Sequence, residues 1–130
     1  LKHIIISSMI IIYSLIARGT LVLAEYTSYD GDFPQFARKV IAKSPRNKSK
    51  KTFTKENLSF TFFSDDEFTF LCLTNTSVPR ETSYKFLDTL ASEFFSDYHK
   101  QGVRDANTSW AAKFSIRIKE LMEKNETREK

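Results

Sequence analysis

Cysteine, glycine and proline are all scarce in this sequence. A single cysteine, Cys72, rules out a disulfide within the chain, and three glycines and three prolines in 130 residues exclude a low-complexity linker. Cys72 lies in the apolar stretch FTFLCLT, where a thiol usually serves as a small core side chain. Neither histidine, His3 or His99, stands in a motif with it. We therefore expect a protein of the cytosol without thiol catalysis.

The short motifs of common catalytic and cofactor sites are also missing. The chain has no P-loop, GxGxxG, HExxH or GxSxG motif and no set of cysteines and histidines with metal spacing. Its one acidic cluster, residues 65–67, lacks further oxygen ligands at offsets suited to Ca²⁺ or Mg²⁺. We therefore predict that the protein is not an enzyme, and that it holds no cofactor and no metal ion.

What the sequence does contain is enough apolar material for one folded domain. Hydrophobic residues make up 41% of the chain and aromatic residues 14%, with 12 phenylalanines. A domain of this length buries roughly two thirds of its unfolded surface. The composition therefore indicates a globular protein with a real core, and not a disordered one.

Positive charge gathers in one part of the chain, which has a net charge of +4. The cations concerned are Lys43, Arg46, Lys48, Lys50, Lys51 and Lys55. The run lacks the interleaved aromatic residues of a base-stacking surface, so nucleic acid is not an expected partner. An anionic membrane face or an acidic partner is one alternative. The simpler interpretation is a solvated loop over residues 46–51.

The stretch from Ile10 to Tyr26 organises the predicted fold. Two apolar runs flank Arg18, Gly19 and Thr20, and this pattern is typical of a β-hairpin in which glycine supplies a positive φ. The first run is apolar at nearly every position, as a strand covered on both faces is, so the hairpin is expected at the centre of the sheet. Strict alternation places three residues of the second run on each face: Leu21, Leu23 and Glu25 on one, Val22, Ala24 and Tyr26 on the other.

The rest of the chain predicts three helices and three more strands. Asp32 is placed to cap a helix that opens with Phe33 and stops at Pro45. Later helices are expected from residues 78–80 to Gly102, with Pro79 in the first turn, and from a cap at Asn107 or Thr108. The predicted strands are Thr52–Thr54, Leu58–Ser64 and Phe68–Thr74.

The element order is therefore ββαβββαα, an α+β protein with a five-stranded antiparallel sheet. One helix is expected on one face of the sheet and two on the other, in a three-layer α/β/α sandwich. The first and last strands, both apolar on two faces, are expected to meet in the middle.

The N-terminal residues admit two interpretations. Lys2 and the apolar residues after it fit a signal peptide cleaved near Ala24, and the sequence has five glycosylation motifs, at Asn47, Asn57, Asn75, Asn107 and Asn125. The Arg-Gly break and the lack of paired cysteines favour the other interpretation. In it, residues 1–8 are a leader or an added segment, and the domain starts at Met9.

A binding role has better support than catalysis. The first helix and the strand around Phe53 are expected side by side at the edge of the sheet. Phe36, Val40, Lys51 and Phe53 would border a groove there, which accepts an extended segment by strand addition or a helix through its apolar face. The alternative is that these side chains belong to the core.

Several stretches resemble the longin domain of vesicular R-SNAREs, most closely the synaptobrevin-like, tetanus-insensitive VAMP type. They are IIYSLIARGTLVLAEY, GDFPQFARKVIAKSP, TFTKENLSFTFF and FTFLCLT, and the final SWAAKFSIRIKELMEKNE stands where that family has a third helix. The resemblance runs from Ile11 to Glu123. It implies a profilin-like longin fold over residues 9–124 and a frayed tail, residues 125–130, that leads to a SNARE motif not contained in this chain.

The resemblance also implies a function. Such domains fold back on their own SNARE motif and are recognised by sorting adaptors, on the cytosolic face of endosomal, lysosomal or secretory vesicle membranes. Cognate SNAREs are further implied partners, the membrane is reached through a C-terminal anchor beyond this chain, and the isolated domain is expected to be a monomer. The implied hydrophobic groove consists of Phe33, Phe36, Val40, Ile41, Lys51 and Phe53.

Two residues depart from the family pattern. Lys51 stands where relatives often have leucine, which narrows the apolar strip, and Phe53 replaces the tyrosine of some relatives, which excludes phosphorylation there. Two alternatives to the SNARE interpretation remain at this point. One is a free-standing longin-like subunit of a tethering or adaptor complex, and the other is a secreted glycoprotein.

Overall fold

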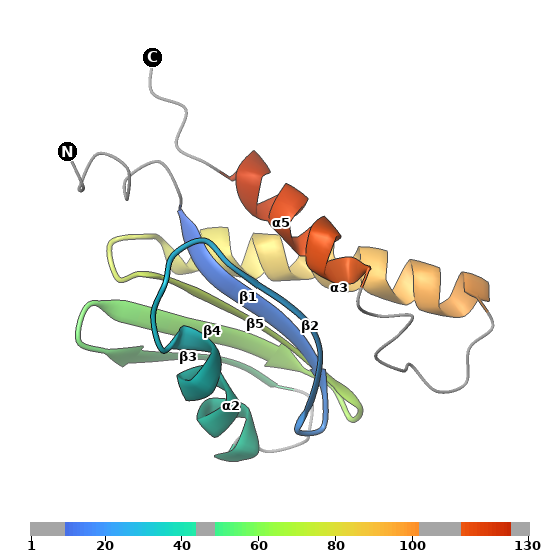
Figure 1. The fold of residues 1–130 in the computed structure, drawn as a ribbon, viewed down its shortest axis with the longest axis horizontal. Coiled ribbons are helices and arrows are strands. Elements are labelled where there is room, and N and C mark those ends of the chain that lie inside the picture. The colour runs from blue at the N-terminus through green and yellow to red at the C-terminus, as the bar shows by residue number, and fades with distance from the viewer. Residues whose placement is uncertain (1–9, 44–48, 102–112, 126–130) are drawn as a thin grey trace.

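The computed structural model describes residues 10–43, 49–101 and 113–125 (Figure 1). Its elements confirm the predicted order ββαβββαα and the α+β class. In chain order they are β1 (Ile11–Arg18), β2 (Leu21–Thr27), α2 (Phe33–Lys43), β3 (Ser49–Lys55), β4 (Leu58–Ser64), β5 (Phe68–Asn75), α3 (Arg80–Gln101) and α5 (Phe114–Lys124).

The five strands form one sheet in the order β2-β1-β5-β4-β3, with every neighbouring pair antiparallel. The first and last strands meet in the middle, as predicted, with Leu15 opposite Leu71. The prediction that the whole hairpin lies at the centre is wrong, because β2 is an edge strand and its Leu21 is 53% exposed. β5 pairs with the side of β1 that the hairpin leaves open, and β4 and β3 follow beyond it, so β2 stays at the edge with β1 as its one neighbour in the sheet.

A β-bulge explains why the expected alternation in β2 is also wrong. Ile16 pairs with Ala24 but Ala17 pairs with Val22, so Leu23 is an extra residue in the edge strand. Leu23 and Ala24 consequently both enter the core on one face of the sheet, while Val22 packs on the other face. Alternation of residue types carries no sign of such an insertion.

Two apolar clusters, one on each face, hold the three layers together. The helix α2 covers one face, and α3 and α5 cover the other, as predicted (Figure 1). Alternate residues of β5 divide between the faces as expected. Phe68, Phe70 and Cys72 face α3, and Leu71 and Leu73 face α2.

Phenylalanine fills the core between the sheet and α3. Phe68 and Phe70 of β5 meet Phe94 and Phe95 of α3 edge to face, with ring centroids 5.0–5.6 Å apart, and Phe114 of α5 lies 5.3 Å from Phe94. Such pairs add to the free energy gained by burial alone. This cluster accounts for much of the unusual phenylalanine content.

The predicted solvated loop over residues 46–51 is wrong for its last three residues. Strand β3 spans Ser49–Lys55 and is longer than the predicted Thr52–Thr54, so residues 49–51 are strand residues. The reason is pairing, because every residue of β3 has a partner in β4, from Ser49 opposite Ser64 onward. The polar composition of this edge strand gives no apolar pattern from which its full length could be predicted.

Helices α2 and α3 begin at the predicted residues. Helix α2 begins at Phe33, and the amide of Phe36 donates to the carbonyl oxygen of Asp32 at 3.0 Å. Helix α3 begins at Arg80, so Pro79 immediately precedes the helix and does not lie in its first turn. The predicted leader of residues 1–8, the helix end at Gly102 and the cap at Asn107 or Thr108 lie outside the described residues.

The position of β1 bears on the signal-peptide interpretation. Residues 13–18 pair with β2 on one side and with β5 on the other, and every residue of β1 except Arg18 is buried. Cleavage near Ala24 would remove this central strand together with most of β2.

Candidate binding groove

Helix α2 and strand β3 lie side by side at one edge of the sheet, as predicted. The rings of Phe36 and Phe53 stack with centroids 6.5 Å apart and an angle of 18° between their planes. Phe60 of β4 lies 5.0 Å from Phe36 and 6.1 Å from Phe53. Phe53 is 45% exposed and Phe60 is buried, so the three rings connect the core to the surface.

The strand geometry explains which residues of β3 face α2. Phe53 pairs with Phe60, and alternation places Lys51 and Lys55 on the same face as Phe53. The ammonium of Lys55 lies 4.5 Å from the centroid of the Phe36 ring, a cation–π contact at the end of the apolar strip. Basic side chains thus border the exposed rings.

The six residues of the predicted groove occupy different depths. Phe33, Phe36 and Val40 are half-buried, and Lys51 and Phe53 are exposed. Ile41 is 4% exposed and belongs to the core under α2. The structure brings Phe36 and Phe53 into contact, while Ile41 supports the helix from beneath.

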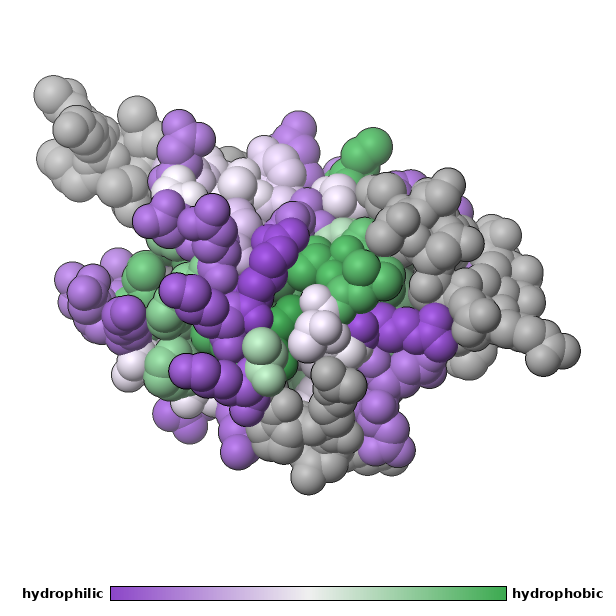
Figure 2. Space-filling model, turned by 60° about the horizontal axis from the view of Figure 1, so that its bottom comes forward, coloured by the Kyte–Doolittle hydropathy of each residue, from purple (hydrophilic) through white to green (hydrophobic). Residues whose placement is uncertain are grey.

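A cavity of about 310 Å³ lies at one end of this strip, and Phe33 and Phe36 are the predicted residues that line it. Its other lining residues are Asp32, Lys55, Glu56, Leu58 and Phe60. Sequence reasoning missed Lys55 and Phe60, although both share a strand face with residues that it named. Figure 2 shows apolar surface broken by hydrophilic side chains on the face of the molecule that carries α2 and β3.

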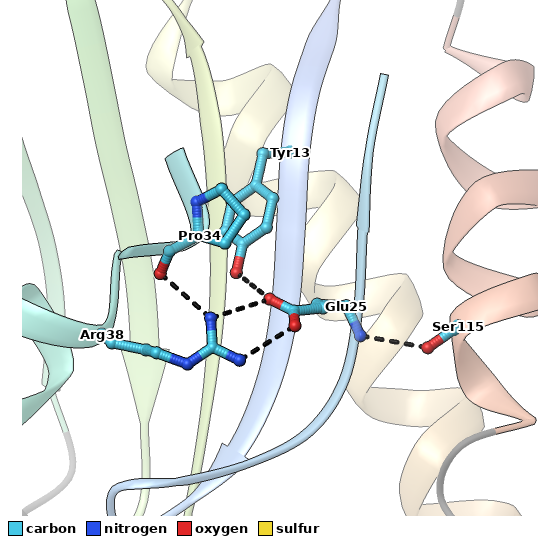
Figure 3. A network of polar contacts seen from close by, with 5 residues as sticks. All are labelled: Tyr13, Glu25, Pro34, Arg38 and Ser115. Carbon is cyan, nitrogen blue, oxygen red and sulfur yellow. Dashed lines mark hydrogen bonds and ion pairs between the residues drawn. The ribbon is translucent and has the colours of Figure 1, made fainter. Parts of the chain in front are cut away.

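A polar network fixes α2 to the sheet (Figure 3). The hydroxyl of Tyr13 donates to Oε1 of Glu25 at 2.6 Å, and Arg38 of α2 donates to Oε1 and Oε2 of Glu25 at 3.2 and 2.9 Å. Arg38 also donates to the carbonyl oxygen of Pro34 at 3.1 Å, and Ser115 of α5 accepts the amide of Glu25 at 3.1 Å. The network therefore joins β1, β2, α2 and α5.

The two acidic groups of the network have shifted pKa values. Burial, and then the hydrogen bond to the Glu25 carboxylate, raise the pKa of Tyr13 far above its usual range. Burial alone would raise the pKa of Glu25, but the hydrogen bonds from Arg38 and Tyr13 outweigh it and lower that pKa below its ordinary value. Glu25 is consequently a carboxylate at neutral pH, held between two donors. The sequence did not predict this network. The one feature that pointed to it was Glu25, a single acidic residue in an apolar strand.

These features suit binding. The described residues hold no group of three or more His, Cys, Asp or Glu side chains that could bind a metal ion. None of the helices in the described ranges combines the length and apolarity needed to cross a membrane. What the edge offers is an exposed aromatic strip with a basic border.

The sequence matches the family model for Longin, the regulated-SNARE-like domain, over residues 23–118. It is 34% identical to vesicle-associated membrane protein 7B of Dictyostelium discoideum over 115 residues, which cover 88% of this chain and 44% of that protein. It is 38% identical to vesicle-associated membrane protein 727 of Arabidopsis thaliana over 88 residues, covering 68% of this chain and 37% of the relative.

A human protein gives a similar result. Vesicle-associated membrane protein 7 of Homo sapiens is 29% identical over 90 residues, which cover 69% of this chain and 41% of that protein. The chain thus spans less than half the length of these three relatives. Membership of a regulated-SNARE-like family agrees with the prediction that the chain is not an enzyme. The family match and the ββαβββαα fold together show that this chain belongs to the longin family, as a domain of the type found in VAMP7-like R-SNAREs.

Proposed function

We propose that this chain is the regulatory and targeting domain of an R-SNARE in vesicle trafficking and membrane fusion. In this proposal the full-length protein continues into a SNARE motif and a membrane anchor, and the domain works on the cytosolic face of endosomal, lysosomal or secretory vesicles. Family membership and the greater length of the relatives support this assignment. The domain itself is monomeric in isolation.

The groove between α2 and β3 is the proposed binding site for the SNARE motif of the same protein and for sorting adaptors. The observation that carries this assignment is the Phe36–Phe53 stack, which leaves a large aromatic side chain 45% exposed at a sheet edge. An amphipathic segment that lays its apolar face on Phe53 removes that surface from water. Acidic residues on the same segment would pair with Lys51 and Lys55.

Binding in the groove gives a physical basis for autoinhibition. A SNARE motif that covers Phe53 with its apolar face cannot use that face to pair with cognate SNAREs at the same time. Adaptors that occupy the groove would release the motif. The domain then sets how much of the protein is free to enter fusion complexes.

The test is a titration of the ¹⁵N-labelled chain with a peptide of the SNARE motif taken from the same transcript beyond the codon for Lys130. Amide shifts are expected around Phe36, Phe53 and Phe60. The variant Phe53→Ala should weaken binding, while Ile116→Ala should not, although Ile116 of α5 is 65% exposed.

Shifts confined to α3 and α5, or equal loss of binding in the two variants, would show that the groove assignment is incorrect. A transcript that ends without heptads would instead favour a free-standing longin-like subunit. Reading that transcript is therefore the first step of the experiment.

A further inference from the structure

A second cavity lies on the α3 face of the sheet, away from the groove. It has a volume of about 300 Å³ and is formed by β3, β4, the end of β5 and the start of α3. Eight of its eleven lining residues are serine or threonine, and the others are Val78, Pro79 and Arg80. Figure 1 shows the β3–β4 turn and the start of α3 on the same side of the molecule. The cavity is thus a hydroxyl-rich recess at a helix N-terminus.

One hydroxyl in this recess has no partner. Thr74 is fully buried, and its Oγ1 is the buried side-chain polar atom without a hydrogen bond among the residues that the structure describes. Thr74 lies opposite Ser59 in the sheet register, so both side chains are on the cavity face. A buried hydroxyl left unpaired is costly, and such groups call for an explanation.

Three of the neighbouring hydroxyls, those of Thr52, Thr61 and Ser83, are already engaged. Oγ1 of Thr52 lies 3.2 Å from Oγ1 of Thr61 and 3.4 Å from the hydroxyl of Tyr84. Ser83 hydrogen-bonds to the Cys72 thiol. Among the described residues of the recess, Thr74 thus supplies the buried hydroxyl that is left without a partner.

The electrostatics of the recess favour an anion. Arg80 lines it, and none of the described aspartates and glutamates does. Lys50 extends over the ring of Tyr84, with its ammonium 5.6 Å from the centroid, next to the Thr52 side of the cavity. The acidic group in the first turn of α3, Glu81, is exposed and does not line the cavity. The 22-residue helix α3 also directs the positive end of its dipole here.

We propose that this recess binds a phosphate group. The Arg80 guanidinium, the amides of Arg80 and Glu81 in the first turn of α3 and the Thr74 hydroxyl donate hydrogen bonds to its oxygens, which gives Thr74 Oγ1 the partner that it lacks. The volume accommodates a phosphate together with the sugar or polyol that carries it. The source is either a soluble phosphate compound or a phosphorylated lipid headgroup.

The first experiment titrates the ¹⁵N-labelled chain with inorganic phosphate at constant ionic strength, with sodium chloride as the balancing salt. Saturable amide shifts are expected from Thr74 to Ser83. Thr74→Val keeps the shape of the side chain but removes Oγ1, and should weaken binding about tenfold, the loss of one charge-assisted hydrogen bond. Thr69→Val is the matched control, because Thr69 lies on the same strand but does not line the cavity.

A second pair of variants guards against effects of folding. Arg80→Gln should weaken phosphate binding about tenfold, while Lys85→Gln, on the exposed surface of the same helix, should not. Thermal melts of all four variants check that each is folded. Shifts that never saturate, or equal affinity in Thr74→Val and Thr69→Val, would overturn the proposal, as would a cavity that holds only water at high phosphate.

Vesicles separate the two sources. Cosedimentation with phosphatidylcholine vesicles that contain phosphatidylinositol phosphate, but not with vesicles of equal charge made with phosphatidylserine, points to a lipid headgroup if Thr74→Val abolishes it. Saturable phosphate binding without cosedimentation points to a soluble compound. The groove between α2 and β3 takes part in neither experiment, so the phosphate site can be confirmed or refuted independently of the proposed SNARE function.

Discussion

Replacement of Tyr13 by phenylalanine tests whether the Tyr13–Glu25–Arg38 network holds the domain together. Tyr13 is fully buried, and its hydroxyl makes one short hydrogen bond, 2.6 Å to the Glu25 carboxylate. A hydrogen bond to a charged group contributes about 1.5–3 kcal/mol. Glu25 keeps Arg38 in the variant and its side chain is 32% exposed, so water can replace the lost donor. The lower end of the range therefore applies.

We expect Tyr13→Phe to lower the free energy of unfolding by about 1.5 kcal/mol and the melting temperature by about 6 °C, given the size of the domain. Urea denaturation followed by circular dichroism measures the first quantity and calorimetry the second. Tyr26→Phe is the matched control. Tyr26 is half-buried on the neighbouring strand, and its hydroxyl makes no hydrogen bond within the described part of the chain. It should change stability by less than about 0.5 kcal/mol.

Comparison of wild type with Tyr13→Phe at different pH values gives a second test, and the pKa of Glu25 determines the direction of the expected change. Arg38 and Tyr13 lower the pKa of Glu25 in the folded state, so its contribution is complete above the unfolded pKa and is lost as the pH falls through the folded pKa. The stability difference between wild type and Tyr13→Phe should therefore shrink in acid. Equal stability of the two proteins at pH 7, or a difference that grows in acid, would refute the reasoning.

Three further predictions concern other parts of the molecule. Phe53→Ala should weaken binding of the SNARE-motif peptide about thirtyfold by calorimetry, because about 90 Å² of exposed ring, worth about 2 kcal/mol, is lost. It should also lower stability, because the ring packs on Phe36 and Phe60, and a variant that folds but binds the peptide with unchanged affinity would contradict the assignment. Burial raises the pKa of Cys72 to about 12, so Ellman's reagent should label this thiol only after urea unfolds the chain. Labelling of the native protein at pH 8 would contradict this prediction. Arg117→Gln removes a half-exposed ion pair with Glu93, in which Nε and Oε1 are 2.5 Å apart. The free energy of unfolding should fall by at most about 1 kcal/mol, and by less in 1 M salt, because salt screens exposed charges. A larger loss of stability at high salt would contradict this prediction.

Much of the fold was predictable because its strongest patterns are local. Strands β1 and β5 carry apolar residues on both faces, and this alone predicts that they are central and adjacent. The apolar spacing of α2 and α5 likewise identified their buried faces, including Ile41 and Ile118. Such patterns reflect burial directly, so they can be recognised without knowing which element packs against them.

The predictions are wrong where pairing with a neighbouring strand determines the local structure. The extra residue Leu23 is defined only by its pairing with β1, and Lys50 and Lys51 are strand residues because β4 supplies their hydrogen bonds. The candidate groove shows the same division. The proximity of Phe36 and Phe53 was predictable from topology, whereas the contributions of Phe60 and Lys55 depend on how deeply each side chain sits.

The place of β5 between β1 and β4 has a consequence for synthesis on the ribosome. Ser14 reaches the carbonyl oxygen of Leu71 across 57 positions of sequence, and the β1–β2 and β3–β4 hairpins share no direct pairing without the strand between them. A nascent chain that has not yet released residue 75 therefore carries two separate hairpins with uncovered apolar faces. Closure of the sheet must wait for β5, so shielding by chaperones matters most during that interval.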